Sequence, residues 1–178
     1  MKGGPPLALP PKTTHKQNMK QPRLLVSACL CGAICRYDGK AAGMPLLAPY
    51  MASGLVLPFC PETSGGLPVP RDPCEICQNP KDCSKRRVLS KTGKDCTAEF
   101  ERGAALALAA AHAHGIATAL LKDKSPSCGS RFVYDGSFGG QLVEGAGFTA
   151  ALLKKNGLAV FGEAELEEAL RHAGVWAG

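Results

Sequence analysis

The chain has 178 residues, the size of one domain with a hydrophobic core. Its apolar fraction of 45% is that of a globular protein, and no stretch approaches the ~18 apolar residues of a membrane-spanning helix. The net charge of +6 is local, because residues 1–23 hold five Lys or Arg and no acid, whereas the other residues hold 16 cations and 15 acids. The charge therefore gives no reason to expect that the folded body binds DNA.

The first 22 residues differ from the others in composition. They carry four prolines before Thr13, few large apolar residues and no periodic pattern. We expect residues 1–22 to form a disordered, basic, proline-rich tail and residues 23–178 to form one α/β domain. The apolar stretch among the first residues is too short and too rich in proline for the apolar region of a signal peptide, so we expect a cytoplasmic protein.

From residue 23 onward, hydrophobic runs alternate with helical patterns. Strands are predicted over 24–28, 55–59, 116–121 and 158–161. Helices are predicted over 44–53, 97–114, 147–156 and 164–172, the second of them capped by Thr97. Strands separated by helices predict a single Rossmann-like three-layer domain, with a mainly parallel sheet of about four to five strands flanked by helices.

Two further segments do not fit this alternation. Residues 61–95 are rich in Pro, Gly, Cys and charge, which predicts a long loop with a functional role. Residues 131–143 alternate in polarity around Tyr134-Asp135-Gly136-Ser137, which indicates a β-hairpin.

Cysteine placement is the most informative feature of the sequence. The count of nine is odd, and in a reducing compartment spaced cysteines more often bind metal or react than form disulfides. Cys29, Cys60 and Cys128 each follow a predicted strand. Parallel strands end at one edge of their sheet, where such folds bind ligands, so the three thiols should converge. This pattern suits an iron–sulfur cluster, a zinc ion with one open position, or a reactive thiol with two bystanders.

Polar residues accompany these cysteines. Glu62 follows Cys60 by two residues, and a carboxylate beside a metal can act as a base on bound water. Ser125 and Ser127 lie in the turn after the third strand and could bind a substrate or a cluster sulfur. Lys122 lies at the end of that strand and could hold an anion.

Two arginines and an acid are further candidates for substrate binding. Arg36 and Asp38 lie in a turn shortly after the first cysteine. Arg71 follows a glycine-containing run that lets the backbone approach a ligand, and its guanidinium could pair with a polar edge or a phosphate.

Seven motifs occur in an order that matches a known family. They are Ser27-Ala28-Cys29-Leu30, Arg36-Tyr37-Asp38-Gly39, Cys60-Pro61-Glu62, Gly65-Gly66-Leu67-Pro68-Val69-Pro70-Arg71, Gly93-Lys94-Asp95-Cys96-Thr97, Leu121-Lys122 with Ser125-Pro126-Ser127-Cys128-Gly129, and Tyr134-Asp135-Gly136-Ser137-Phe138. Together they resemble the thiouracil desulfidase (TudS-like) family over about residues 23–163.

The resemblance implies a [4Fe–4S] cluster held by Cys29, Cys60 and Cys128. It further implies that the open fourth iron binds the sulfur of a thiolated pyrimidine such as 2-thiouracil, and that water replaces this sulfur without net redox change. By the same resemblance Glu62 handles protons and Ser125 contacts the substrate. The substrate could be a free base, a nucleoside or a thiolated tRNA nucleotide, and the protein a monomer or a homodimer without membrane association.

Two alternatives remain open at this point. One is a zinc- or cluster-binding regulatory or RNA-binding module without catalysis. The other concerns the ligands: Cys31 and Cys35 could compete for the cluster, and a second cysteine group could hold a second metal. That group consists of Cys74, Cys77, Cys83 and Cys96. A redox role for Cys74 and Cys77 is poorly supported, because they lie in a charged segment rather than at a helix start beside a first strand.

Overall fold

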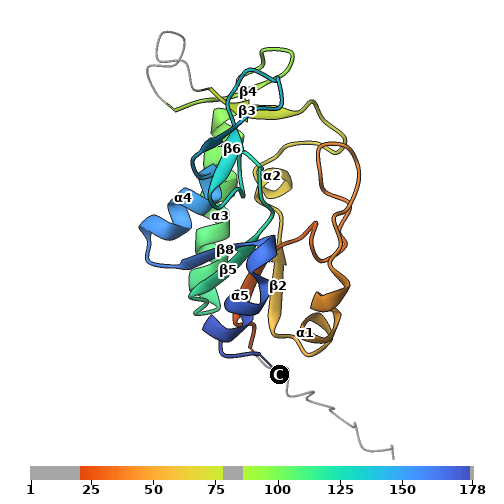
Figure 1. The fold of residues 1–178 in the computed structure, drawn as a ribbon, viewed down its shortest axis with the longest axis vertical. Coiled ribbons are helices and arrows are strands. Elements are labelled where there is room, and N and C mark those ends of the chain that lie inside the picture. Colours follow the sequence, from red (N-terminus) through yellow and green to blue (C-terminus); the bar gives the residue numbers. More distant parts are fainter. Residues whose placement is uncertain (1–20, 78–85, 177–178) are drawn as a thin grey trace, which may run out of the picture.

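A four-stranded parallel sheet forms the centre of the protein (Figure 1). The computed structural model describes residues 21–77 and 86–176, so the prediction of a tail falls largely outside the described residues. The sheet has the order β2-β1-β5-β8 and all its pairs are parallel. Its strands are β1 (Leu24–Ser27), β2 (Val56–Phe59), β5 (Thr118–Leu121) and β8 (Ala159–Gly162). The predicted mainly parallel sheet is confirmed.

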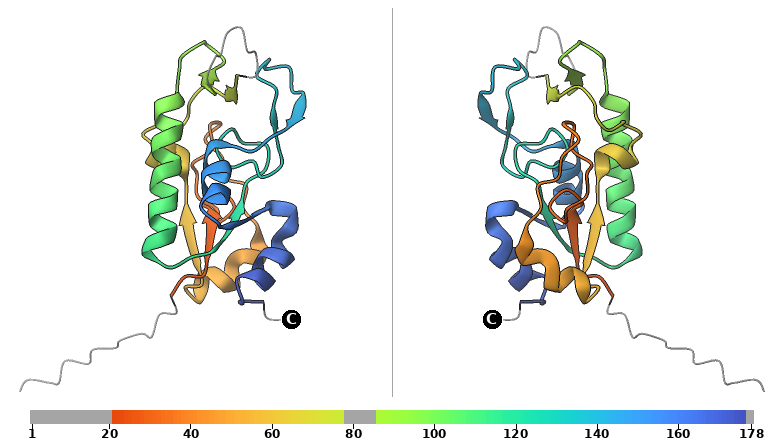
Figure 2. Two further views of the ribbon diagram at one scale, coloured as in Figure 1. Left: turned by 90° about the vertical axis from the view of Figure 1, so that its left-hand side faces the viewer. Right: turned by 90° about the vertical axis from the view of Figure 1, so that its right-hand side faces the viewer.

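Helices cover both faces of the sheet, which makes three layers (Figure 2). One face carries α1 (Ala48–Ala52) and α5 (Leu166–His172), and the other carries α3 (Thr97–Ala113) and α4 (Phe148–Lys155). The side chains of β1 show the reason, because Leu24 and Val26 pack into the first cluster and Leu25 into the second. A strand that is buried on both faces has a continuous run of apolar residues in its sequence. The predicted three-layer fold is confirmed.

A short helix, α2 (Pro61–Ser64), packs very closely on α3. A Cβ added to Gly103 of α3 would lie 2.1 Å from the carbonyl oxygen of Pro61. Gly65 lies equally close to α3, since its added Cβ would be 2.1 Å from the carbonyl oxygen of Glu99. Two glycines therefore allow the backbones to touch, and this contact sets the position of the segment after β2.

The segment predicted as a long loop, residues 61–95, contains regular structure, so that prediction is wrong in part. It holds α2 and an antiparallel pair of strands, β3 (Cys74–Ile76) and β4 (Val88–Ser90). Their apolar side chains were too few to show a period, but Ile76 and Val88 are buried in a third cluster with Phe100 of α3. Tertiary packing rather than local pattern therefore stabilises this pair of strands.

The predicted hairpin around Tyr134 is confirmed as β6 (Phe132–Tyr134) paired antiparallel with β7 (Leu142–Glu144). Both small sheets lie beyond the carboxyl ends of the parallel strands (Figures 1 and 2). They leave the end of the large sheet accessible between them.

Two smaller predictions need correction. The helix expected over 44–53 is a 3₁₀ turn, η1 (Pro45–Leu47), followed by α1. The residue before α3 is Cys96, and the carboxylate of Asp95 accepts a hydrogen bond from the Thr97 backbone N–H at 3.0 Å. Thr97 is thus the first helical residue and not the cap.

A second 3₁₀ turn, η2 (Glu163–Glu165), precedes α5. No helix within residues 21–77 and 86–176 is long and apolar enough to cross a membrane.

Candidate active site

A cavity of about 450 Å³ lies at the carboxyl end of the parallel sheet. Cys29, in the turn after β1, lines it together with Cys60, which links β2 to α2, and Cys128, which lies in the turn after β5. The three strands are neighbours in the sheet, so their ends deliver three thiols to one space. The structure therefore brings together the three cysteines that the sequence singled out.

Burial keeps the thiols of Cys29 and Cys128 protonated in the absence of a metal. Burial first, and the nearby Cys60 second, raise the pKa of Cys29 to about 11. Burial also raises the pKa of Cys128, whereas a hydrogen bond with Ser27 opposes this effect. Because metals bind thiolates, occupation of such a site would release protons.

A fourth cysteine, Cys35, lines the same cavity and is also buried. Burial first, and Cys60 second, raise the pKa of Cys35, and burial likewise raises that of Cys29 and Cys128. The Sγ atom of Cys60 lies 4.0 Å from the carbonyl oxygen of Cys35. Cys31 does not line this cavity and lies instead beside a shallow apolar hollow near Met44 and Met51.

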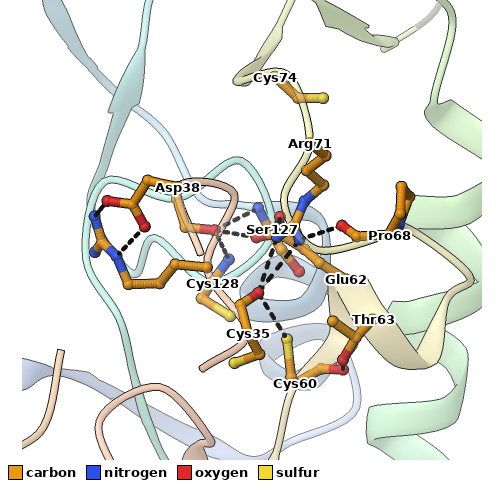
Figure 3. Close-up of polar contacts among 12 residues, drawn as sticks. Cys35, Asp38, Cys60, Glu62, Thr63, Pro68, Arg71, Cys74, Ser127 and Cys128 are labelled. Atoms are coloured by element: carbon orange, nitrogen blue, oxygen red, sulfur yellow. Dashed lines mark hydrogen bonds and ion pairs between the residues drawn. The ribbon is translucent and has the colours of Figure 1, made fainter. Parts of the chain in front are cut away.

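Glu62 lies in the first turn of α2, next to Cys60, and its carboxylate has two partners. Arg71 Nη2 donates to Glu62 Oε2 at 2.6 Å, and Ser125 Oγ donates to Glu62 Oε1 at 3.1 Å. Both guanidinium Nη atoms of Arg71 also donate to the carbonyl oxygen of Cys35, at 3.3 and 3.2 Å. In Figure 3 the Glu62–Arg71 pair lies directly above Cys35 and Cys60.

The hydroxyl of Ser125 is oriented by its surroundings. The backbone N–H groups of Ser127 and Cys128 both donate to Ser125 Oγ at 3.0 Å. These bonds use the lone pairs of the oxygen, so the hydroxyl proton points to Glu62. One serine thus connects the acid of α2 to the backbone of the third cysteine.

Two predicted substrate-binding cations line the cavity but already have acidic partners. Lys122 Nζ donates to Glu163 Oε1 at 2.6 Å, and Arg36 Nε lies 3.1 Å from Asp38 Oδ1. The carboxylate of Asp38 holds Arg36 and is not itself part of the cavity lining. Asp38 therefore orients Arg36 instead of contacting the cavity.

Ser127 requires a correction. Its side chain is fully buried, and its hydroxyl hydrogen-bonds Thr149 Oγ1 of α4 at 2.9 Å. Ser127 does not line the cavity, whereas Ser125, Pro126 and Cys128 do. The predicted contact between Ser127 and substrate is not supported by this arrangement.

The second group of cysteines does not assemble as a metal site. Cys77 is disulfide-bonded, although the sequence favoured metal binding or reactivity over disulfides for its cysteines. The Cys74 thiol donates to the carbonyl oxygen of Asp72 and the Cys96 thiol to that of Lys94. Burial first, and the proximity of Cys96 second, raise the pKa of Cys74 to about 12. Cys83 lies outside the described residues.

In the part of the chain that the structure describes, no three His, Cys, Asp or Glu side chains are placed to hold a single metal ion. A four-iron cluster does not require its thiolates to meet at one point, because each binds a different iron.

Several cavity residues were given no role by sequence reasoning. Glu75 and Lys91 come from the β3–β4 region, and Tyr134 and Phe138 come from the β6–β7 hairpin. Tyr134 and Phe138 stood in a family motif, but nothing local showed that the two hairpins face the cysteines. Glu163, which holds Lys122, was also not found.

Comparison with known proteins agrees with this geometry. A family model described as 2-thiouracil desulfurase matches residues 24–165. The chain belongs to the 2-thiouracil desulfurase family. The predicted resemblance is thereby confirmed, and the matched region spans all four strands of the parallel sheet.

Two proteins are similar to this chain over most of its length. A Bacillus subtilis (strain 168) protein named uncharacterized protein YbbK is 38% identical over 150 residues, which are 83% of this chain and 99% of that protein. A solved structure named [4Fe-4S]-dependent thiouracil desulfidase TudS is 44% identical, with a TM-score of 0.79 over 87% of this chain and 99% of that chain.

The residues of the cavity suit an iron–sulfur cluster. Three thiols line one space, and thiolates are the ligands that such clusters use in proteins. The same space holds one carboxylate and one hydroxyl that are hydrogen-bonded to each other. The cavity thus combines three thiols with a carboxylate and a hydroxyl that are hydrogen-bonded to each other.

Proposed function

We propose that this protein is a [4Fe–4S]-dependent thiouracil desulfidase whose cluster is held by Cys29, Cys60 and Cys128. The observation that carries the proposal is that three thiols from separate strand ends line one cavity beside Glu62. The family membership and the name of the 44% identical structure support it. Bound through three thiolates, the cluster would supply a soft Lewis acid that selects sulfur over the oxygen of ordinary uracil and polarises the C=S bond.

The reaction that we propose exchanges sulfur for oxygen. A thiocarbonyl and water give a carbonyl and hydrogen sulfide, so atoms and electrons balance without an oxidant or a reductant. The attacking water must lose both of its protons, and the leaving sulfur must receive both to depart as hydrogen sulfide. Both transfers need a group that can accept and return a proton within hydrogen-bond reach of the reacting carbon.

Glu62 is the residue that this site offers for these transfers. Its carboxylate accepts a proton from the attacking water at Oε1, the oxygen that Ser125 contacts, while Arg71 holds the other oxygen in place. Ser125 directs Oε1 toward the turn that carries Cys128 and can donate a hydrogen bond to the substrate when Glu62 is protonated. Arg71 therefore acts on Glu62, a role different from the direct substrate contact that the sequence indicated.

Arg36 and Lys122 are the side chains that we propose for holding the polar edge of the pyrimidine. Both line the cavity, and their acidic partners Asp38 and Glu163 fix their side-chain directions. We propose a free thiolated base or its nucleoside as substrate. A thiolated tRNA nucleotide is a further case that the assay below can include.

The test is sulfide release from 2-thiouracil by protein reconstituted with iron and sulfide under anaerobic conditions. Wild-type protein should release hydrogen sulfide and uracil in equal amounts. The Glu62→Gln variant should lose about 10²- to 10⁴-fold in kcat, the usual contribution of general acid–base catalysis, and keep its iron content. Glu101→Gln, at an exposed acid of α3, is the matched control and should behave as wild type.

Two results would contradict the proposal. One is a protein with a complete cluster that releases no sulfide from 2-thiouracil, 2-thiouridine or thiolated tRNA. The other is full sulfide release by Glu62→Gln, because the proposed reaction needs this carboxylate for proton transfer. The first result would favour the non-catalytic regulatory or RNA-binding alternative, whereas the second would remove Glu62 from the reaction and leave catalysis to other groups of the site.

A further inference from the structure

The loop between β6 and β7 supplies the cavity with an aromatic side chain that the core does not use. Phe138 lines the cavity and is half-buried. Among the described residues, the three clusters of buried side chains and the hydrophobic residues packed on them do not include it. Phe59 also lines the cavity but packs into the core, and Tyr37 is 43% exposed. Phe138 is thus an apolar ring kept at a cavity wall without a packing role.

The backbone of Phe138 is held in a conformation that aromatic residues rarely adopt. Its φ angle is 58°, in the left-handed region that glycine tolerates and that costs other residues free energy. Such conformations persist only where the surroundings fix them, and they concentrate at functional sites. A glycine at this position would relieve the backbone, so the ring itself is the feature that needs an explanation.

Glu75 of β3 is what fixes this loop. Its side chain is buried, and its Oε2 atom accepts hydrogen bonds from the backbone N–H of Gly136 at 2.9 Å and of Phe138 at 3.0 Å. Among the described residues, no salt bridge to Glu75 is formed. Hydrogen bonds from backbone N–H groups therefore offset the burial of this charge. A carboxylate of β3 thus holds the loop between β6 and β7, and both Glu75 and Phe138 line the cavity.

We propose that the ring of Phe138 is the surface on which the pyrimidine of the substrate stacks, and that Glu75 is the positioning residue that keeps it there. The inference rests on the proposed function, since it assumes a pyrimidine in this cavity. An aromatic ring binds the face of any base, whatever its exocyclic atoms. Stacking at Phe138 should therefore contribute equally to 2-thiouracil and to uracil, whereas selection for sulfur belongs to the cysteine end of the cavity.

The first test compares Phe138 variants by their binding of 2-thiouracil and uracil to the cluster-loaded protein, measured by calorimetry. Phe138→Gly should weaken both ligands by the same factor, about 5- to 150-fold, the range that stacking a base on an aromatic ring is worth. Its melting temperature should stay at or above that of wild type, because glycine adopts the positive φ freely. Phe138→Tyr should bind as wild type, and so should Phe132→Ala, which removes a 42% exposed ring outside the cavity lining.

The second test asks whether Glu75 acts through Phe138. Glu75→Gln keeps an acceptor oxygen for the two N–H groups and should bind both ligands nearly as wild type, whereas Glu75→Ala should approach Phe138→Gly. The double variant Glu75→Ala/Phe138→Gly should bind no more weakly than Phe138→Gly alone, because residues that act as one unit are not additive. Additive losses would contradict the positioning role, since a purely structural effect or a direct contact of Glu75 with substrate would add to the loss of the ring.

The outcomes separate this inference from the proposed function. A folded Phe138→Gly variant that binds both ligands as tightly as wild type would overturn the stacking role and leave the desulfidase assignment intact. A loss confined to 2-thiouracil would also overturn it, because stacking does not distinguish sulfur from oxygen. Wild-type protein that binds uracil but releases no sulfide would contradict the proposed function instead.

Discussion

The protein contains two groups of cysteines that look alike in sequence and differ in space. Cys29, Cys60 and Cys128 are far apart in the chain, yet they line one cavity at the carboxyl end of the parallel sheet. Cys74 and Cys77 have the local spacing of a metal or redox motif, yet Cys77 is disulfide-bonded and the Cys74 thiol donates to the carbonyl oxygen of Asp72. Convergence therefore depends on topology and not on local spacing, because parallel neighbouring strands deliver their ends to one place.

The two groups also differ in what surrounds them. The strand-end cysteines share their cavity with the hydrogen-bonded set of Glu62, Arg71 and Ser125. Cys74 lines the same cavity, but in Figure 3 it lies on the other side of Arg71 from Cys35 and Cys60. Its thiol contacts the carbonyl oxygen of Asp72 at 3.6 Å. A cluster of thiols becomes a candidate for catalysis here only where an acid and a hydroxyl accompany it.

The largest effect should come from removing a strand-end thiol. Cys29→Ser, Cys60→Ser and Cys128→Ser should each abolish the iron–sulfur charge-transfer absorption after anaerobic reconstitution, and with it sulfide release. Each removes one of only three thiolates. Iron and sulfide analysis measures the loss, and the melting temperature of the metal-free variants shows that they fold. A cluster that survives all three changes would show that the strand-end cysteines are not its ligands, and the contrast between the two cysteine groups would be lost.

Ser125→Ala should have the next largest effect. The change removes the hydrogen bond to Glu62 and leaves two backbone N–H groups without their acceptor. We expect kcat to fall about 10- to 100-fold, the usual cost of losing a group that orients a metal-site residue, with the iron content unchanged. Ser130→Ala, which loses a hydrogen bond to Asp123 outside the catalytic set, is the matched control. Equal rates in the two variants would argue against a role of Ser125 in the reaction.

Gly103→Ala tests the packing that places Glu62. The added methyl group would collide with the carbonyl of Pro61, so α2 must shift, at a cost of about 1–3 kcal/mol in the free energy of unfolding. Thermal unfolding should show a fall in Tm of roughly 2–4 °C per kcal/mol, and kcat should fall as well because α2 carries Glu62. Ala109→Ser, at an exposed position of the same helix, should change neither.

Cys74→Ser should have the smallest effect, and it tests whether the second group of cysteines takes part in cluster binding. Cluster content and kcat should remain at wild-type values, and the free energy of unfolding should change by no more than about 0.5–1.5 kcal/mol, the net value of one hydrogen bond. A loss of cluster in this variant would show that the hairpin cysteines take part in ligation.

Much of this molecule could be predicted from its sequence. The four buried runs predict strands because their apolar residues are continuous, and the helices between them require parallel order. From those two facts follows the meeting of Cys29, Cys60 and Cys128, with Glu62 two residues from the second. These features depend on local patterns and on the handedness rules of crossover connections, both of which a sequence carries.

Only the tertiary structure decided how the site is completed. The bond from Ser125 to Glu62 joins residues 63 positions apart, and no local pattern states which of two neighbouring serines faces the cavity. Ser127 turns instead to Thr149 of α4, and Glu75 crosses from one hairpin to the loop of the other to hold Phe138. Such contacts depend on the packing of α2 on α3 and of the hairpins on the core. The sequence by itself therefore determined the sheet and its three thiols, whereas packing between distant segments decided which polar and aromatic groups face them.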